Sequence, residues 1–267
     1  MVSIASTRAA RTRSARLQVA QYDPYLLILV VVLTVFGLVT IWSADGGGII
    51  TAGSPVVRQA VYAVGGLIAM AMLTNLDYRY LKSFAVVIYF GTVLMLASLL
   101  VIGTNIGGSV RWIQFGPVSF QPSEAAKIGV IIALAAFISE RHEEMDRIHN
   151  FLFTIAIVAV PMALVFQQPD LGTTAVFGAI WLGMLLLSST RILYILGTAL
   201  LSAPFSVFAW HYLLHDYQKD RLLVSYDPNR DYFGQGFNII QAQVTIGSAG
   251  WFGHGLSGGS QSEFQLL

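Results

Sequence analysis

The segment from Arg111 to Lys127 carries ionisable and aromatic side chains between two apolar runs, and here the sequence concentrates groups that could do chemistry. Pro122 suits the first position of a helix because it has no amide hydrogen to leave unbonded. Glu124 would then lie in the first turn, where the helix dipole favours an anion, and Lys127 would follow on the same face. The spacing predicts an ion pair at the start of a helix.

The same helix is predicted to span a membrane. The apolar run from Ile128 to Ile138 rises only about 16 Å, and a start at Pro122 extends it to about 25 Å. Glu124 and Lys127 are thereby drawn toward the membrane. An unpaired charge at depth costs about 3 kcal/mol, so we expect the two side chains to be salt-bridged inside the bundle and to face a polar cavity. The alternative is a structural ion pair that only fixes the helix position.

Two further groups of polar residues lie beside predicted spans. Arg111 and Trp112 fit either anchoring at the membrane interface or, through the guanidinium, binding of a phosphate. Asp170 is predicted to cap the helix that begins at Leu171, and capping alone would explain it. Gln168 adds a polar side chain to the same short connection, which favours a connection drawn inward beside a wet cavity.

The composition is that of a polytopic membrane protein. The 267 residues are 55% hydrophobic and 11% charged, with a mean hydropathy of +0.68. The net charge is only +1, and the basic residues are scattered between apolar runs and do not gather on one face. We therefore expect no nucleic-acid partner. The absence of cysteine excludes disulfides, thiolate metal sites and a cysteine nucleophile.

Seven apolar runs predict seven membrane-spanning helices in an all-α bundle. The runs are Tyr25 to Trp42, Ala60 to Leu76, Phe84 to Gly103, Pro122 to Ile138, Phe151 to Phe166, Leu171 to Leu187 and Ile192 to Leu214. Basic residues favour the N-terminal tail and the loops after the second, fourth and sixth runs, which places the N-terminus in the cytoplasm. This predicts a cytoplasmic basic tail (1–22), a seven-span bundle (23–214) and a large extracytoplasmic loop (215–267).

Three patterns in the C-terminal part have simple interpretations. Gly253 to Gly258 matches G-x-G-x-x-G, but no predicted strand precedes it, so we interpret it as glycine-rich turns. His211 and His215 have the spacing of metal ligands, yet they lie where an aromatic belt is expected. The segment from Phe237 to Val244 favours a short interfacial helix, although part of it also alternates like a strand.

At these residues the sequence resembles the SEDS family, which includes RodA, FtsW and SpoVE. The matching pieces are short, occur in family order and cover residues 23–267. They are Arg111-Trp112-Ile113, Gln121-Pro122-Ser123-Glu124 with Lys127, Gln168-Pro169-Asp170-Leu171-Gly172, and Asn238-Ile239-Ile240-Gln241 running to Gly247. The last of these and the Gly-Ser-Gln-Ser stretch are more similar to RodA than to FtsW.

The resemblance implies a multi-pass glycosyltransferase of the bacterial cytoplasmic (inner) membrane, with ten helices and an extracytoplasmic active face. Such an enzyme polymerises lipid II into peptidoglycan for cell-wall elongation and cell shape. By the family pattern Arg111, Glu124, Lys127 and Asp170 line the cavity for the lipid-linked diphosphate, and we add Trp112 and Gln168 as candidate substrate-binding residues. The family's catalytic Asp, a general base, would follow Leu267, so we expect the chain to be inactive alone.

The resemblance also implies partners besides lipid II and membrane lipids, namely a monofunctional class B penicillin-binding transpeptidase. No cofactor is evident. A divalent cation near the diphosphate is compatible with the family, but no ligand set for one can be read. The rival interpretation is a transporter or flippase of a lipid-linked cell-wall precursor, suggested by the charged residues inside predicted spans.

Overall fold

The computed structural model describes residues 23–102, 104–106, 109–115, 118–251, 253–256 and 258, and at 101–102, 104–106, 109–111, 114–115, 118 and 235 it describes the backbone alone. In this part of the chain five helices are long and apolar enough to cross a membrane, and two shorter apolar helices accompany them. The seven are α2 (Pro24–Ala44), α3 (Pro55–Thr74), α5 (Ala85–Ile102), α6 (Pro122–Glu140), α7 (Ile148–Gln167), α8 (Leu171–Leu186) and α9 (Ile192–Phe208). They match the seven predicted spans, which confirms a polytopic helical membrane protein. The predicted tail, residues 1–22, lies outside the described residues.

Two helices begin at residues that suit a helix start. Asp23 precedes α2, and its carboxylate accepts a hydrogen bond of 2.9 Å from the backbone N–H of Tyr25. α6 begins at Pro122, as predicted, with Gln121 in the N-cap position. A proline at the first helical position costs no hydrogen bond, because that N–H would have no partner within the helix.

The chain forms two compact units. One comprises Met1–Thr74 with Asp231–Leu267, and the other, the bundle unit, comprises Asn75–Arg230. In the first unit α2 and α3 contact each other, and neither helix has a buried residue. The same unit contains α11 (Gln235–Ala249), a helix that includes the segment for which the sequence favoured a helix over a strand.

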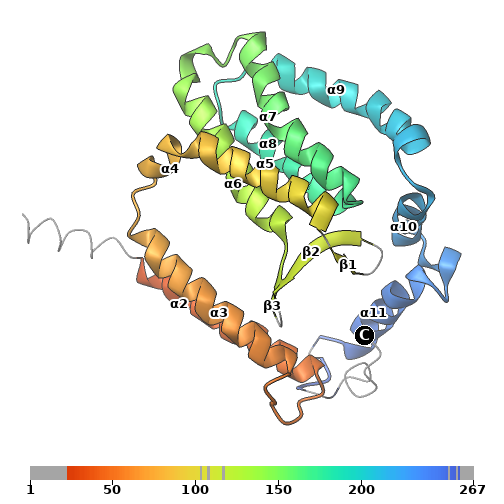
Figure 1. Ribbon diagram of the computed structural model, residues 1–267. Helices are drawn as coiled ribbons and strands as arrows, with labels where there is room; N and C mark the ends of the chain where they lie inside the picture. Colours follow the sequence, from red (N-terminus) through yellow and green to blue (C-terminus); the bar gives the residue numbers. More distant parts are fainter. Residues whose placement is uncertain are drawn as a thin grey trace, which may run out of the picture. The chain divides into compact units, whose positions relative to one another are not determined.

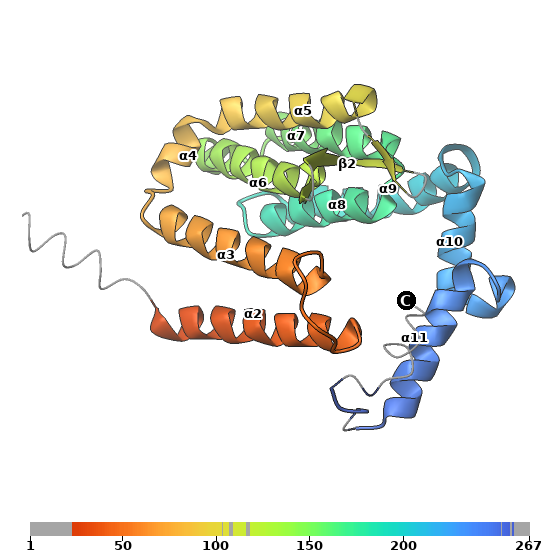
Figure 2. The same cartoon turned by 60° about the horizontal axis from the view of Figure 1, so that its bottom comes forward.

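The core of the bundle unit lies among α5, α6, α7 and α8, which run side by side (Figures 1 and 2). Its fully or almost fully buried apolar residues are Leu96, Ala126, Val130, Leu134, Val158, Val165 and Phe177. Gly129 of α6 faces the buried Thr92 of α5 so closely that a Cβ at this position would overlap the threonine hydroxyl. Small residues allow this kind of close approach between membrane helices.

A small sheet connects α5 to α6, and the sequence analysis did not predict it. Its strands are β1 (Thr104–Ile106), β2 (Ser109–Phe115) and β3 (Val118–Phe120), antiparallel in the order β1-β2-β3. Strands this short depend on partners across the sheet, which a single sequence does not reveal.

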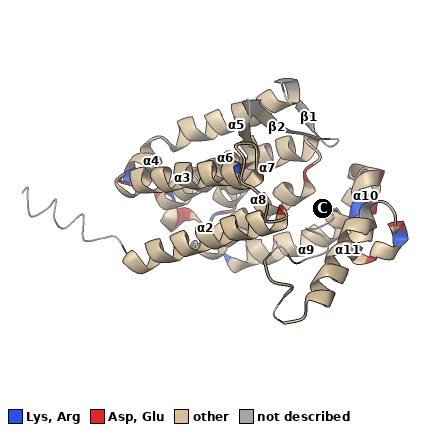
Figure 3. Cartoon of the chain, turned by 90° about the horizontal axis from the view of Figure 1, so that it is seen from below, with Lys and Arg blue, Asp and Glu red and all other residues tan. Residues whose placement is uncertain are grey.

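Short helices complete the described chain. They are α4 (Arg79–Ser83), the 3₁₀ turns η1 (His142–Glu144) and η3 (Pro228–Asp231), the π turn η2 (Ala209–Leu213), and α10 (Asp216–Tyr226). Figure 3 shows that the long helices carry few charged residues along their length, whereas α10 carries several. α10 lies in the segment that the sequence analysis assigned to a loop.

Candidate functional site

The connections of the bundle unit bring the predicted site residues to one end of it. α7 returns between α6 and α8 through short connections, so α6 and α8 run in the same direction and begin at the same end. We call this the polar end and define it by four residues, which are Glu124, Lys127, Gln168 and Asp170. The first two lie in the first turns of α6, and the other two lie between α7 and α8.

Glu124 and Lys127 form the predicted salt bridge. The Nζ atom of Lys127 lies 2.8 Å from each carboxylate oxygen of Glu124. The prediction that the pair is buried was wrong, because the side chain of Glu124 is 58% exposed and that of Lys127 is 23% exposed. The pair therefore lies on the surface of the bundle unit, where a ligand can reach it.

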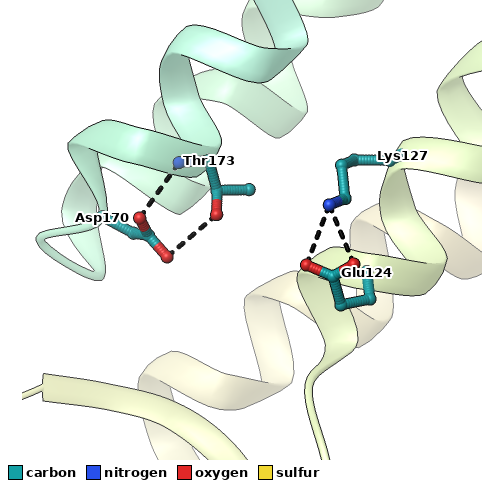
Figure 4. A network of polar contacts seen from close by, with 4 residues as sticks. All are labelled: Glu124, Lys127, Asp170 and Thr173. Carbon is teal, nitrogen blue, oxygen red and sulfur yellow. Dashed lines mark hydrogen bonds and ion pairs between the residues drawn. The ribbon is translucent and has the colours of Figure 1, made fainter. Parts of the chain in front are cut away.

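Asp170 caps α8, as predicted. Its Oδ1 atom accepts a hydrogen bond from the backbone N–H of Thr173, and its Oδ2 atom accepts one from the Thr173 hydroxyl, both at 3.0 Å. The residue is only 9% exposed. Figure 4 shows the Asp170–Thr173 pair of α8 and the Glu124–Lys127 pair of α6 facing one another across the space between the two helix starts.

Gln168 is almost fully buried, with 2% of its surface exposed. Its side-chain Nε2 donates a hydrogen bond of 3.1 Å to the backbone oxygen of Leu96 in α5. This contact joins the end of α7 to α5 and so holds the turn that carries Asp170. The geometry gives Gln168 a positioning role for that turn.

Arg111 and Trp112 lie in β2, on the segment that leads into α6. The side chain of Arg111 is outside the described part of the structure. Trp112 is partly buried, and its backbone pairs with Thr104 of β1. A substrate-binding role for these two residues stays a prediction.

A cavity of about 310 Å³ adjoins Asp170 and was not predicted from the sequence. It lies between the start of α8 and one face of α10. Its lining is formed by Pro169, Asp170, Leu171, Gly172, Tyr217, Gln218, Arg221, Leu222 and Ser225. A signal was present in the sequence, since the α10 residues recur at helical spacing, but Asp216 to Tyr226 is too polar to stand out as an apolar stripe.

A second hollow is apolar. It has a volume of about 530 Å³ and lies along α7, α8 and α9, with Trp181 and Leu182 of α8 among its lining residues. Leu171, Gly178 and Leu182 are spaced seven and four residues apart, so they lie on one face of α8. The helix thus has its start at the polar cavity and its middle along an apolar groove.

The described residues contain no group of three or more His, Asp or Glu side chains that could hold a metal ion. His211 lies in the π turn η2, and His215 precedes α10.

Gly253 and Gly255 have φ angles of 69° and 81°, as expected for glycine-rich turns.

Comparison with known proteins identifies similar sequences over almost the whole chain. The family model of FtsW, RodA and SpoVE cell cycle proteins matches residues 24–267. The peptidoglycan glycosyltransferase MrdB of Escherichia coli K12 is 33% identical over 245 residues, which are 92% of this chain and 65% of MrdB. The probable peptidoglycan glycosyltransferase FtsW of Geobacter metallireducens is 34% identical over 264 residues, 93% of this chain and 68% of that protein.

Solved structures give the same picture. A chain in the structure described as "Structural coordination of polymerization and crosslinking by a peptidoglycan synthase complex" matches with a TM-score of 0.70 and 32% identity, over 88% of this chain and 68% of that chain. The rod shape determining protein RodA of Thermus thermophilus matches with a TM-score of 0.51 and 31% identity, over 59% of this chain and 50% of that chain. The chain spans about two thirds of the length of the curated relatives it matches.

Proposed function

This chain belongs to the FtsW, RodA and SpoVE family, and we propose that it forms the substrate-binding part of a membrane-embedded peptidoglycan glycosyltransferase. The substrate is lipid II, and the polar end holds its diphosphate and the adjoining sugar. In the reaction a hydroxyl oxygen of one sugar forms a bond to C1 of another. The bond from C1 to the diphosphate breaks, and the diphosphate leaves with the electron pair. The hydroxyl proton passes to a general base, which by the resemblance is an aspartate outside the six candidate residues.

The observation that carries this proposal is the pairing at the polar end. Glu124 and Lys127 are three residues apart on one helix, so their salt bridge does not hold two helices together. A charged pair placed at the start of a membrane helix without such a structural task favours a role toward a ligand. In that role the Lys127 ammonium stabilises the negative charge that grows on the departing diphosphate.

The two hollows on α8 support an amphiphilic substrate. The polar cavity adjoins Asp170, and the apolar groove lies farther along the same helix. A lipid with a charged head and an apolar chain fits a polar cavity followed by an apolar groove better than a free sugar does. We propose that the protein spans the bacterial inner membrane with its N-terminus in the cytoplasm, which leaves the polar end on the extracytoplasmic face.

A RodA-type role in elongation and cell shape is the finer form of the proposal. The relatives include proteins named MrdB and FtsW at similar identity, so overall similarity does not separate the two roles. Expression of the gene in strains depleted of their own MrdB or FtsW separates them. Rescue of rod shape supports the RodA-type role, and rescue of division alone contradicts it.

We also propose that polymerisation needs the part of the relatives' length that this chain does not match, and that a class B penicillin-binding transpeptidase binds the whole protein. The solved complex described as coordinating polymerization and crosslinking supports such a partner. Residues 1–267 alone should give no polymer, whereas a fusion to the unmatched remainder of E. coli MrdB should. Polymer from residues 1–267 alone would place the catalytic base within them, with Asp170 as the first residue to replace.

The test of the proposed activity uses the native gene product in vesicles with purified lipid II. We expect glycan strands, detected by gel separation after the lipid is released. Movement of lipid II between the two leaflets without polymer would instead establish the rival function, a flippase. The Lys127→Met variant serves as the control for polymer made by a contaminating enzyme, because a contaminant is unaffected by it.

A further inference from the structure

The cavity between α8 and α10 has a cationic wall that lies outside the polar end. The lining residues on α10 are Tyr217, Gln218, Arg221, Leu222 and Ser225. Their spacing places them on one face of the helix, which is turned to the start of α8. Two of these side chains, those of Tyr217 and Arg221, are exposed and carry hydrogen-bond donors, whereas the exposed Ser225 hydroxyl donates to the backbone oxygen of Arg221 at 2.7 Å.

Arg221 differs from the other cation of α10. Lys219 lies 3.5 Å from the carboxylate of Asp216 and does not line the cavity. For Arg221 the described part of the chain provides no salt-bridge partner. A guanidinium beside a cavity and without a carboxylate is suited to an anion, because its N–H groups match two phosphate oxygens at once.

The opposite wall limits where an anion can lie. The carboxylate of Asp170 lines the cavity and binds Thr173. Because like charges repel, a phosphate must lie nearer to Arg221 than to Asp170. A volume of about 310 Å³ leaves room beside the phosphate for part of a sugar. The carboxylate of Asp170 can accept hydrogen bonds from the hydroxyl groups of that sugar.

We propose that Arg221 binds a phosphate of the lipid-linked substrate in this cavity, so that α10 adds a binding residue to the substrate site that the polar end forms at the start of α8. This inference rests on the proposed function and adds a binding residue from a segment outside the membrane spans. The Tyr217 hydroxyl donates a hydrogen bond to the ligand from the same face. α10 is thereby part of the substrate site and more than a connection after α9.

The test measures binding of undecaprenyl diphosphate and of phosphatidylglycerol to the native gene product in nanodiscs of zwitterionic lipid. Both lipids carry phosphate, and only the first carries the diphosphate of the proposed substrate. The variants are Arg221→Gln, Arg221→Lys and, as the matched control on the same helix, Lys219→Gln. Thermal unfolding of each variant establishes that the fold is retained, and Arg221→Lys keeps the test valid if Arg221→Gln unfolds.

We expect Arg221→Gln to weaken undecaprenyl diphosphate binding about tenfold to a hundredfold, because the variant loses one charge-assisted contact of that strength. Arg221→Lys should lose part of this, because it keeps the charge but not the paired N–H geometry. Lys219→Gln should bind as the unchanged protein does. Equal weakening for phosphatidylglycerol would overturn the inference, since Arg221 would then be a general contact to anionic lipid.

The outcomes also separate this inference from the proposed function. If undecaprenyl diphosphate binds through Arg221 but no polymer forms from lipid II, the inference holds and the proposed activity fails. If the protein makes polymer and Arg221→Gln makes it at the same rate and the same lipid II concentration, the activity holds and the inference fails. If the unchanged protein does not bind undecaprenyl diphosphate, both fail.

Discussion

The two ends of the bundle unit use polar side chains in different ways. At the end opposite the polar end, Arg191 binds Asp146 at 2.9 Å, and Arg141 donates a hydrogen bond of 3.1 Å to Asn150. The first of these contacts joins connections 45 residues apart in the sequence. At the polar end the salt bridge joins Glu124 to a residue three positions away on the same helix.

This difference separates a salt bridge that joins two connections from a salt bridge that lies within one helix and is accessible to a ligand. At the opposite end the Arg191–Asp146 salt bridge joins two connections, and the Tyr194 hydroxyl donates a hydrogen bond to the backbone oxygen of Asp146. Glu144 and Arg147 form a second salt bridge there, three residues apart within one connection. Glu124 and Lys127 add little to the attachment of α6 to its neighbours, which comes from the buried apolar residues of the core. The Glu144–Arg147 pair lies in the connection between α6 and α7, whereas Glu124 and Lys127 lie at the start of a helix long enough to cross a membrane, where a charged pair favours a role toward a ligand.

The largest expected effect is on activity at the polar end. Lys127→Met should lower kcat/KM for lipid II about a hundredfold, the usual size for one charged group that stabilises a transition state. Stability should change by less than about 1 kcal/mol, because an exposed ion pair contributes little. The measurements are polymerisation by the native gene product and its thermal unfolding, and full activity of the variant would make the pair an anchor only.

A smaller effect is expected where helices pack, away from either end. Gly129→Ala would place a methyl group against the Thr92 hydroxyl, and overpacking of this kind costs about 1 to 3 kcal/mol. Gly91→Ala, on α5 beside Thr92, is the control, because no atom lies within 4 Å of its added Cβ. Unfolding should shift downward for the first variant only, and an equal shift in both would show that the close approach of α5 and α6 is unimportant.

Asp170 allows capping to be separated from chemistry. Asp170→Ala should destabilise the protein by about 1 kcal/mol through loss of the N-cap, whereas Asp170→Asn should keep the cap, since Asn caps helices as well as Asp does. If the carboxylate also binds substrate, Asp170→Asn should lose activity without losing stability. Normal polymerisation by Asp170→Asn would leave capping as the whole role of this residue.

The smallest effect is expected from the salt bridge at the opposite end. Arg191 and Asp146 are 58% and 46% exposed, so Arg191→Gln should cost less than about 1 kcal/mol and leave polymerisation unchanged. The check is unfolding and polymerisation measured beside Lys127→Met. A loss of activity as large as that of Lys127→Met would remove the distinction between the two ends.

Much of the fold was predictable, because local rules decide it. All seven spans, the start of α6 at Pro122, the cap at Asp170 and the salt bridge from Glu124 to Lys127 follow from apolar runs and helix spacing within single segments. These features depend on neighbours a few residues away in the sequence. Even a single sequence therefore contains the information that fixes them.

Features that depend on distant partners were missed. The strands β1 to β3 form only by pairing with one another. The polar composition of α10 gives no apolar stripe, and its cavity also needs the start of α8 as a second wall. The exposure of Glu124 was mispredicted for the same reason, since burial depends on which helices lie beside a residue. The hydrogen bond from Gln168 to Leu96 joins residues 72 positions apart, a distance that sequence spacing does not resolve.

One measurement tests the distinction between the two ends most directly. It compares the affinity for lipid II of the native gene product with that of two double variants. One variant combines Glu124→Gln with Lys127→Met, and the other combines Asp146→Asn with Arg191→Gln. Each removes one salt bridge and both of its charges, so neither leaves an unpaired charge behind. We predict that both proteins remain folded, that the first binds lipid II at least about tenfold more weakly, and that the second binds it as the unchanged protein does. Equal affinities in the two variants would contradict the assignment of the polar end as the substrate site.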